Sequence, residues 1–162
     1  MKVIRILAII FTSILVNSCA ILKPPIITKN DSIGEFKYVF ISPTNSLTSG
    51  TGATYGGQYY SSSKTVNPSD VISGILMKEG FILLPEIKQE VVDETLIVNY
   101  GESGRRNVVG GLGGYTIEVT IKLISAKTHE TIYSCTAEGQ GATEADDIRK
   151  AITRCLSGLS LK

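Results

Sequence analysis

The chain has 162 residues and carries 16 Lys and Arg against 15 Asp and Glu, a formal net charge of +1. This length suits a single domain whose hydrophobic core needs neither a metal nor a disulfide. The near-neutral charge argues against nucleic acid as a partner, because nucleic-acid binding relies on clustered positive charge. It also argues against purely electrostatic attachment to a membrane surface.

The first 18 residues have the organisation of an export signal. Lys2 and Arg5 precede the apolar segment Ile6 to Val16, which is shorter than the roughly 20 residues of a membrane-spanning helix. An ordinary secretory signal would more usually end in an Ala-x-Ala pattern. This segment ends instead in Val16-Asn17-Ser18-Cys19, which resembles the lipobox of bacterial lipoproteins. The resemblance implies that the signal peptide, residues 1–18, is removed and that the Cys19 thiol is acylated.

The residues after Cys19 bear on localisation. Position 20 is Ala and not Asp, which resembles lipoproteins of the outer membrane, and no acidic run follows to mark export to the cell surface. The resemblance therefore implies an outer-membrane lipoprotein facing the periplasm, whose membrane anchor is palmitate and further acyl chains on one cysteine. Pro24 and Pro25 disfavour a helix, so residues 19–34 are predicted to be the lipidated cysteine and a flexible tether.

The single folded domain is predicted to span residues 35–162 and to begin with a strand, a loop and a helix. Residues 35–42 place apolar side chains on both faces, which is typical of a central strand. Residues 44–66, rich in Ser, Thr, Gly and Tyr, are expected to form a long loop or a loose hairpin. Asn67 and Pro68 begin a helix, and a short strand follows it, which would complete a β-α-β unit if it pairs beside the first strand.

The second half is predicted to be a β-meander followed by a helix. Strands are expected at residues 94–100, 115–125 and 131–138, with a glycine-rich loop over residues 101–114. Thr143 caps the last helix, whose first turn is acidic and therefore complements the helix dipole. The predicted fold class is α+β, with one mostly antiparallel sheet of about five strands and two helices packed on one face.

This order of elements resembles small periplasmic lipoprotein domains of unknown function and the amino-terminal domains of envelope assembly proteins. The resemblance covers most of residues 35–159 and includes a long alternating strand, the turn Ala126-Lys127-Thr128 and a second strand. Related domains often place a tryptophan in that second strand, where this chain has Tyr133. The resemblance implies a domain that binds partners or scaffolds envelope machinery.

Two cysteines besides Cys19 lie on inner faces of predicted elements. Cys135 falls on the last strand and Cys155 on the last helix. In an oxidising compartment they can form a disulfide, which would contribute about 3 kcal/mol for a loop of this length. They can equally remain free, buried thiols that pack as small hydrophobic groups. The sequence leaves both possibilities open.

The sequence predicts no catalytic residue, no metal site and no cofactor, so we expect no enzyme. The cluster Gly110 to Gly114 is followed by a strand, whereas a phosphate-binding loop needs a helix at that point. His129 is the only histidine and lies in a predicted turn, and one histidine cannot form a histidine-based zinc cluster. Asp146 and Asp147 are explained by their place in the first turn of a helix.

The most plausible binding surface is formed by loops. Tyr55, Tyr59 and Tyr60 offer flat stacking area beside glycine and serine, unless the rings fold back over the sheet. Arg105 and Arg106 are either ligands for a carboxylate or phosphate or simply solvated. We expect a non-enzymatic, lipid-anchored envelope protein that binds a protein partner or scaffolds an assembly. The alternative is a module that binds a glycan or peptidoglycan fragment through the same loops.

Overall fold

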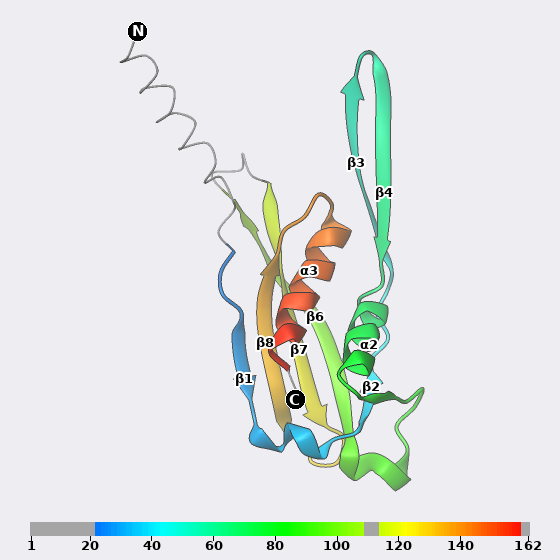
Figure 1. Ribbon diagram of the computed structural model, residues 1–162, viewed down its shortest axis with the longest axis vertical. Coiled ribbons are helices and arrows are strands. Elements are labelled where there is room, and N and C mark those ends of the chain that lie inside the picture. The colour runs from blue at the N-terminus through cyan, green and yellow to red at the C-terminus, as the bar shows by residue number, and fades with distance from the viewer. Residues whose placement is uncertain (1–21, 109–113, 160–162) are drawn as a thin grey trace, which may run out of the picture.

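The computed structural model describes residues 22–108 and 114–159 of the chain. This part has an α+β fold, with a mostly antiparallel six-stranded sheet, a separate two-stranded sheet and two α-helices (Figure 1). The large sheet has the order β1-β8-β7-β6-β2-β5, and β3 pairs with β4. The strands are β1 (Ile26–Lys29), β2 (Tyr38–Ile41), β3 (Leu47–Tyr55), β4 (Gln58–Val66), β5 (Ile82–Leu83), β6 (Thr95–Asn107), β7 (Tyr115–Ser125) and β8 (Thr131–Gly139). The α-helices are α2 (Pro68–Lys78) and α3 (Glu144–Leu156), and short 3-10 helices are η1 (Asp31–Glu35), η2 (Gln89–Glu94) and η4 (Ser157–Leu159).

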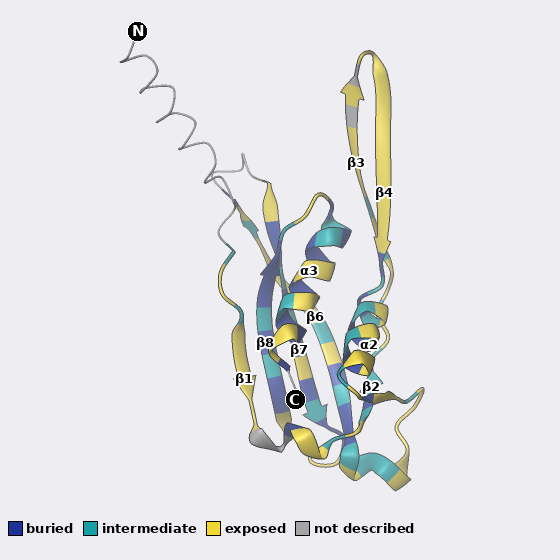
Figure 2. Ribbon diagram, viewed as in Figure 1, coloured by how far each residue is buried: buried dark blue, intermediate teal, exposed yellow. Residues whose placement is uncertain are grey.

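The centre of the large sheet is the antiparallel meander of β6, β7 and β8. The predicted alternation of β7 is confirmed, because Ile117, Val119, Ile121 and Leu123 are all buried. Lys122, on the opposite face, is exposed. Figure 2 shows the buried residues concentrated in these strands and in the helix that covers them. The hydrophobic core therefore lies between this face of the sheet and the helices.

Helix α3 covers β7 and β8, and both helices lie on the same face of the sheet (Figure 1). The Thr143 hydroxyl accepts a hydrogen bond from the Asp146 backbone N–H at 3.2 Å, as the predicted N-cap requires. Ile148 and Ile152 of this helix are fully buried. Within the described residues, no helix has both the length and the apolar character needed to span a membrane.

The predicted β-α-β unit is also present. The Asn67 side chain accepts a hydrogen bond from the Ser69 backbone N–H, and Pro68 occupies the first turn of α2. Strand β2 pairs in parallel with β5 on one side and with β6 on the other. This confirms the prediction that the first apolar segment of the domain forms a non-edge strand.

The segment predicted to be a flexible tether is partly built into the sheet. Residues 26–29 form β1, which pairs with β8 from Ile26 opposite Thr136 to Lys29 opposite Tyr133, and η1 follows. The physical reason is that an extended segment after two prolines satisfies the backbone groups along the edge of β8. The anchoring segment is therefore shorter than the sequence suggested.

The predicted loop over residues 101–114 and the predicted strand number also need correction. β6 continues to Asn107, since β7 offers a partner along this whole length, from Leu96 opposite Ser125 to Asn107 opposite Tyr115. A register shift between Glu102 and Gly104 absorbs the irregularity near the glycines. With β1 and the pair β3–β4, the described chain has six strands in one sheet and two in another, where the sequence predicted about five in all.

Candidate functional site

Residues 47–66 form a long hairpin of β3 and β4, here called the arm, which projects beyond the large sheet (Figure 1). The two strands pair in unbroken register from Leu47 opposite Val66 to Tyr55 opposite Gln58. Gly56 and Gly57 form the turn with φ values of 59° and 80°, which other residues rarely adopt. Most of the arm is exposed (Figure 2).

Two of the three tyrosines predicted to bind, Tyr59 and Tyr60, lie near the turn of the arm, and their side chains are exposed. Tyr59 and Tyr60 are 71% and 59% exposed. The ring of Tyr59 crosses Gly52 on the facing strand so closely that a Cβ there would lie 2.0 Å from the tyrosine hydroxyl. The Tyr60 hydroxyl donates a hydrogen bond to the Gln58 side chain at 3.0 Å. The side chain of Tyr55 lies outside the described residues.

The base of the arm is attached to the N-terminus of α3. The Lys64 ammonium contacts the Asp146 carboxylate at 2.8 Å, and the Ala145 backbone N–H donates to the Ser49 hydroxyl at 2.8 Å. Val66, the last residue of β4, is buried in the core. The arm is therefore fixed at its base and uncovered along its outer length.

A cleft of about 430 Å³ lies between the base of the arm, the start of β7 and the N-terminus of α3. Its lining comprises Ser49, Gly50, Thr51, Gly114, Tyr115, Gln140, Gly141, Ala142, Thr143, Glu144 and Asp147. The Asp147 carboxylate is buried and accepts a hydrogen bond from the Gly141 backbone N–H. Burial raises its pKa to about 6, with the neighbouring carboxylates of Asp146 and Glu144 adding to the effect.

Arg105 and Arg106 lie in β6 and not in a loop, and both already bind carboxylates of this chain. Arg105 pairs with Glu144 and lies over the Tyr115 ring, 5.3 Å from its centroid. Arg106 donates two hydrogen bonds to Glu138, at 2.8 and 2.7 Å. The structure therefore separates these arginines from Tyr59 and Tyr60, with which the sequence grouped them. Their carboxylate partners come from β8 and α3, a pairing that no local sequence signal indicates.

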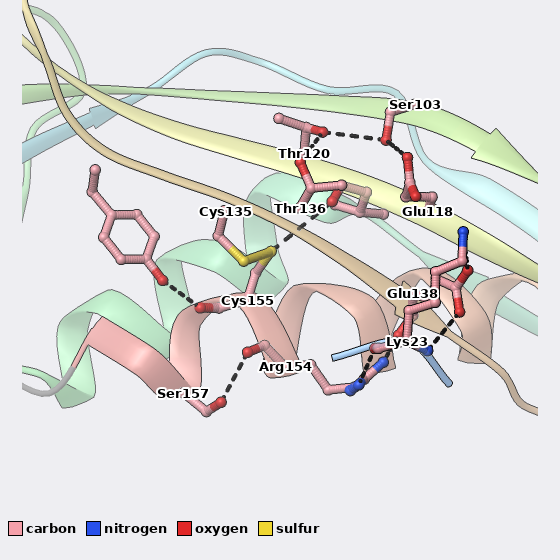
Figure 3. Close-up of a disulfide and its surroundings, with 12 residues drawn as sticks. Lys23, Ser103, Glu118, Thr120, Cys135, Thr136, Glu138, Arg154, Cys155 and Ser157 are labelled. Atoms are coloured by element: carbon pink, nitrogen blue, oxygen red, sulfur yellow. Dashed lines mark hydrogen bonds and ion pairs between the residues drawn. A yellow bond between two sulfur atoms is a disulfide. The ribbon is translucent and has the colours of Figure 1, made fainter. Parts of the chain in front are cut away.

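Glu138 also holds the N-terminal segment, in a cluster here called the Lys23 junction: Lys23, Arg106, Glu138 and Arg154. The Lys23 backbone N–H donates to the Glu138 carboxylate at 3.0 Å, and Arg154 donates to the Lys23 carbonyl oxygen at 2.8 Å (Figure 3). The hydrogen bonds from Arg106 lower the pKa of Glu138 to about 2 although its side chain is buried. This ion cluster fixes the point at which the chain leaves the domain toward Cys19.

Cys135 and Cys155 are joined by a disulfide in the structure, with their Cα atoms 5.5 Å apart (Figure 3). The bond connects β8 to α3, and both residues are fully buried. The Tyr133 hydroxyl donates to the Cys155 carbonyl oxygen at 2.6 Å and ties the same two elements together. Cys19, the predicted lipidation site, lies outside the described residues.

The two edges of the large sheet present apolar side chains to solvent, a feature that the sequence analysis missed. At the β1 edge, Ile26 is 73% exposed and Ile27 41% exposed. At the β5 edge, Ile82 is 53% exposed and Leu83 41% exposed. Both edge strands are very short and have a proline close by, which discourages addition of a further strand and leaves side-chain packing as the mode of contact.

The remaining sequence candidates form no reactive site in the part of the chain that the structure describes. His129 lies in the turn before β8 with a φ of 60°. No group of three or more His, Cys, Asp or Glu residues suited to a metal occurs among the described residues. Most of the glycine cluster, residues 110–113, lies outside them, and Gly114 leads directly into β7.

Comparison with known proteins identifies the fold but not a family. No protein-family model matches the chain, and no curated protein matches its sequence. A solved structure with a similar fold is PelC from Paraburkholderia phytofirmans, a dodecamer, with a TM-score of 0.50 at 15% identity over 84% of this chain and 95% of that one. A second crystal form of the PelC dodecamer gives a TM-score of 0.48 at 15% identity over 85% and 97% of the two chains. At this identity the likeness concerns the fold alone.

Proposed function

We propose that the protein is a non-enzymatic, lipid-anchored subunit of the bacterial envelope that assembles with further copies of itself through the two edges of its large sheet. The observation that carries the proposal is the pair of exposed apolar edges, Ile26 and Ile27 on β1 and Ile82 and Leu83 on β5. Exposed apolar side chains gain free energy when a partner covers them, by about 25 cal/mol for each Å² removed from water.

The position of these edges indicates the kind of assembly. β1 and β5 are the first and last strands in the order of one sheet, so they face away from each other. Contact between unlike edges of successive copies is a heterologous interface, which closes into a ring when the rotation between copies allows it. A protein of this fold, PelC, forms a dodecamer, and this supports a closed assembly of copies here.

In this proposal the protein is anchored through a lipid on Cys19, because residues 16–19 resemble a lipobox. The membrane is the outer membrane, and the domain faces the periplasm. Mass spectrometry of the purified mature protein should find acyl chains on Cys19. A Cys19→Ser variant should carry no acyl chains. Mature protein with an unmodified thiol at this position would contradict the anchor.

The assembly is tested by placing a charge at each edge in the mature protein. We expect Ile26→Asp and Ile82→Asp each to turn a large assembly into monomers in native mass spectrometry, because every heterologous contact uses one edge of each kind. Tyr60→Asp is the matched control, since it adds a carboxylate on the arm at a position whose exposure, 59%, lies between those of Ile26 and Ile82. Assemblies that persist in both edge variants would overturn the proposal.

The cleft beside α3 supports glycan binding as a second candidate function. Polar groups of Gln140, Thr143 and Glu144 line it together with the ring of Tyr115, a combination suited to hydroxyl groups and to the apolar face of a sugar. Binding of peptidoglycan fragments in isothermal titration calorimetry should then be lost in Tyr115→Ala. Loss in Tyr59→Ala and Tyr60→Ala instead would move the glycan site to the arm, and no binding in any variant would exclude this candidate.

A further inference from the structure

Most of the arm is exposed, and its outer portion carries no charged residue. Between Ser49 and Ser63 the sequence holds only Ser, Thr, Gly, Ala, Gln and Tyr. The single charged residue of the arm, Lys64, lies at its base and is paired with Asp146. A two-stranded hairpin by itself is only marginally stable in water, so an arm of this length is stabilised when something covers its end.

The anchor segment determines which end of the molecule lies near the membrane. The Lys23 junction fixes the chain through both backbone groups of Lys23. Only three residues lie between Cys19 and Lys23, so the Cα atoms of these two residues are at most about 14 Å apart. The proposed lipid on Cys19 therefore keeps this end of the domain within about 14 Å of the bilayer surface.

The described chain starts level with the base of the arm, and the arm projects from that level to the end of the molecule at which its turn lies (Figure 1). Each arm strand has nine residues and is therefore about 30 Å long, roughly twice the span of the anchor segment. When the domain stands with this end toward the bilayer, the arm is too long to remain clear of the surface.

The side chains near the turn match the chemistry of a membrane interface. Tyrosine is enriched at lipid headgroup depth, where its ring enters the apolar boundary and its hydroxyl stays hydrated. Tyr59 and Tyr60 are exposed there. With no acidic residue in the arm, anionic lipids do not repel it.

We infer that the turn end of the arm is a second membrane contact, in which Tyr59 and Tyr60 enter the lipid headgroup region and set the orientation of the anchored domain. This inference rests on the proposed lipidation of Cys19. One lipid anchor leaves a domain free to rotate about it, whereas a second contact at a distance fixes its tilt. In a ring of copies, the arms would then present their ends to one membrane plane.

A fluorescent label tests this inference in the full mature protein bound to vesicles of phosphatidylethanolamine and phosphatidylglycerol. Gln58→Cys places the only free thiol at the turn, because Cys19 is acylated and Cys135 and Cys155 are bonded to each other. Glu86→Cys is the control, at an exposed position after β5. We expect a blue shift, lost quenching by iodide and strong quenching by spin-labelled lipid at position 58, and none of these at position 86.

Two further measurements separate the possible failures. In the Gln58→Cys background, Tyr59→Ser with Tyr60→Ser should abolish the blue shift, whereas Ser61→Ala with Ser62→Ala should preserve it. Protein that carries the lipid and floats with vesicles, yet leaves position 58 open to iodide, would overturn this inference alone. Protection from iodide without quenching by spin-labelled lipid would overturn it in favour of a protein contact. Protein without acyl chains would overturn the proposed anchor and this inference together.

Discussion

The large sheet with α3 and the arm are both built around antiparallel strands, but different forces hold them. In the large sheet, β7 has a partner strand on each side and a face covered by α3, with residues such as Ile121 and Ile152 fully buried. The arm has one strand pair, and most of its residues are exposed. Core packing and a disulfide therefore account for the choice of residues in the large sheet and α3. The residues of the arm are suited to contact with something outside the chain.

Substitutions in the core should show the largest effect and define the contrast with the arm. Ile152→Ala should lower the free energy of unfolding by about 2 to 5 kcal/mol, because it leaves a cavity between α3 and the sheet. Ser62→Ala in the arm should change it by less than about 0.5 kcal/mol, since the side chain is exposed. Urea unfolding of the mature protein measures both, and equal losses would refute the contrast.

Removal of the disulfide should have the next largest effect. Replacing Cys135 and Cys155 together by Ala should cost about 3 kcal/mol, because the bond closes a loop with a sequence separation of 20. Thermal unfolding of the native protein with and without reductant provides the same comparison without a substitution. An unfolding temperature that does not respond to reductant would show that the bond adds nothing to the stability of the domain.

The buried carboxylate of Glu138 should make stability fall in acid. The pKa of Glu138 is about 2 in the folded protein against an ordinary value of 4.5, so between these values the folded state binds fewer protons than the unfolded chain. The stabilising effect of the ionised carboxylate is therefore complete only above pH 4.5. We expect this contribution, about 2 kcal/mol, to be lost as the pH falls toward 2. Urea unfolding at a series of pH values measures this loss of stability. The Glu138→Gln variant should not show it. The same slope in both proteins would contradict this role of Glu138.

Asp147 should produce a smaller effect of opposite sign. Its pKa is raised from 3.8 to about 6, so the folded protein holds a proton that the unfolded chain has already released between these values. Stability should therefore decrease as the pH rises from about 4 to about 6. Asp147→Asn should remove this decrease while keeping an oxygen that accepts from Gly141. A decrease of unchanged size in the variant would assign it to another group.

Local sequence signals predicted those elements whose stability depends on local features. Asn67 with Pro68 and Thr143 with its acidic turn located both helices, and the alternation of residues 115–125 located β7. The extension of β6 through its glycines depends on pairing with β7. Because the glycine-rich composition by itself indicates a loop, the sequence analysis predicted a loop there. The arm has no apolar alternation, so the sequence predicted only a long loop or a loose hairpin there. The structure shows a regular hairpin, with Gly56 and Gly57 at its turn.

The candidate sites were less predictable, because they arise from contacts between distant segments. Arg106 meets Glu138 from 32 residues away in the sequence, which no spacing rule anticipates. The apolar edges were missed for a similar reason. Ile26 belongs to a segment that the sequence predicts to be a tether, and it forms a strand only because β8 pairs with it. Strand β5 has only two residues, so its sequence gives no indication that it lies at the edge of a sheet.

A mixing experiment tests the central claim, assembly through unlike edges, most directly. Mature Ile26→Asp and Ile82→Asp proteins are each monomers under this account, but the first keeps an intact β5 edge and the second an intact β1 edge. An equimolar mixture should form a dimer containing one copy of each, detected by native mass spectrometry from the difference in mass, and nothing larger. A mixture that contains only monomers would contradict assembly through these two edges.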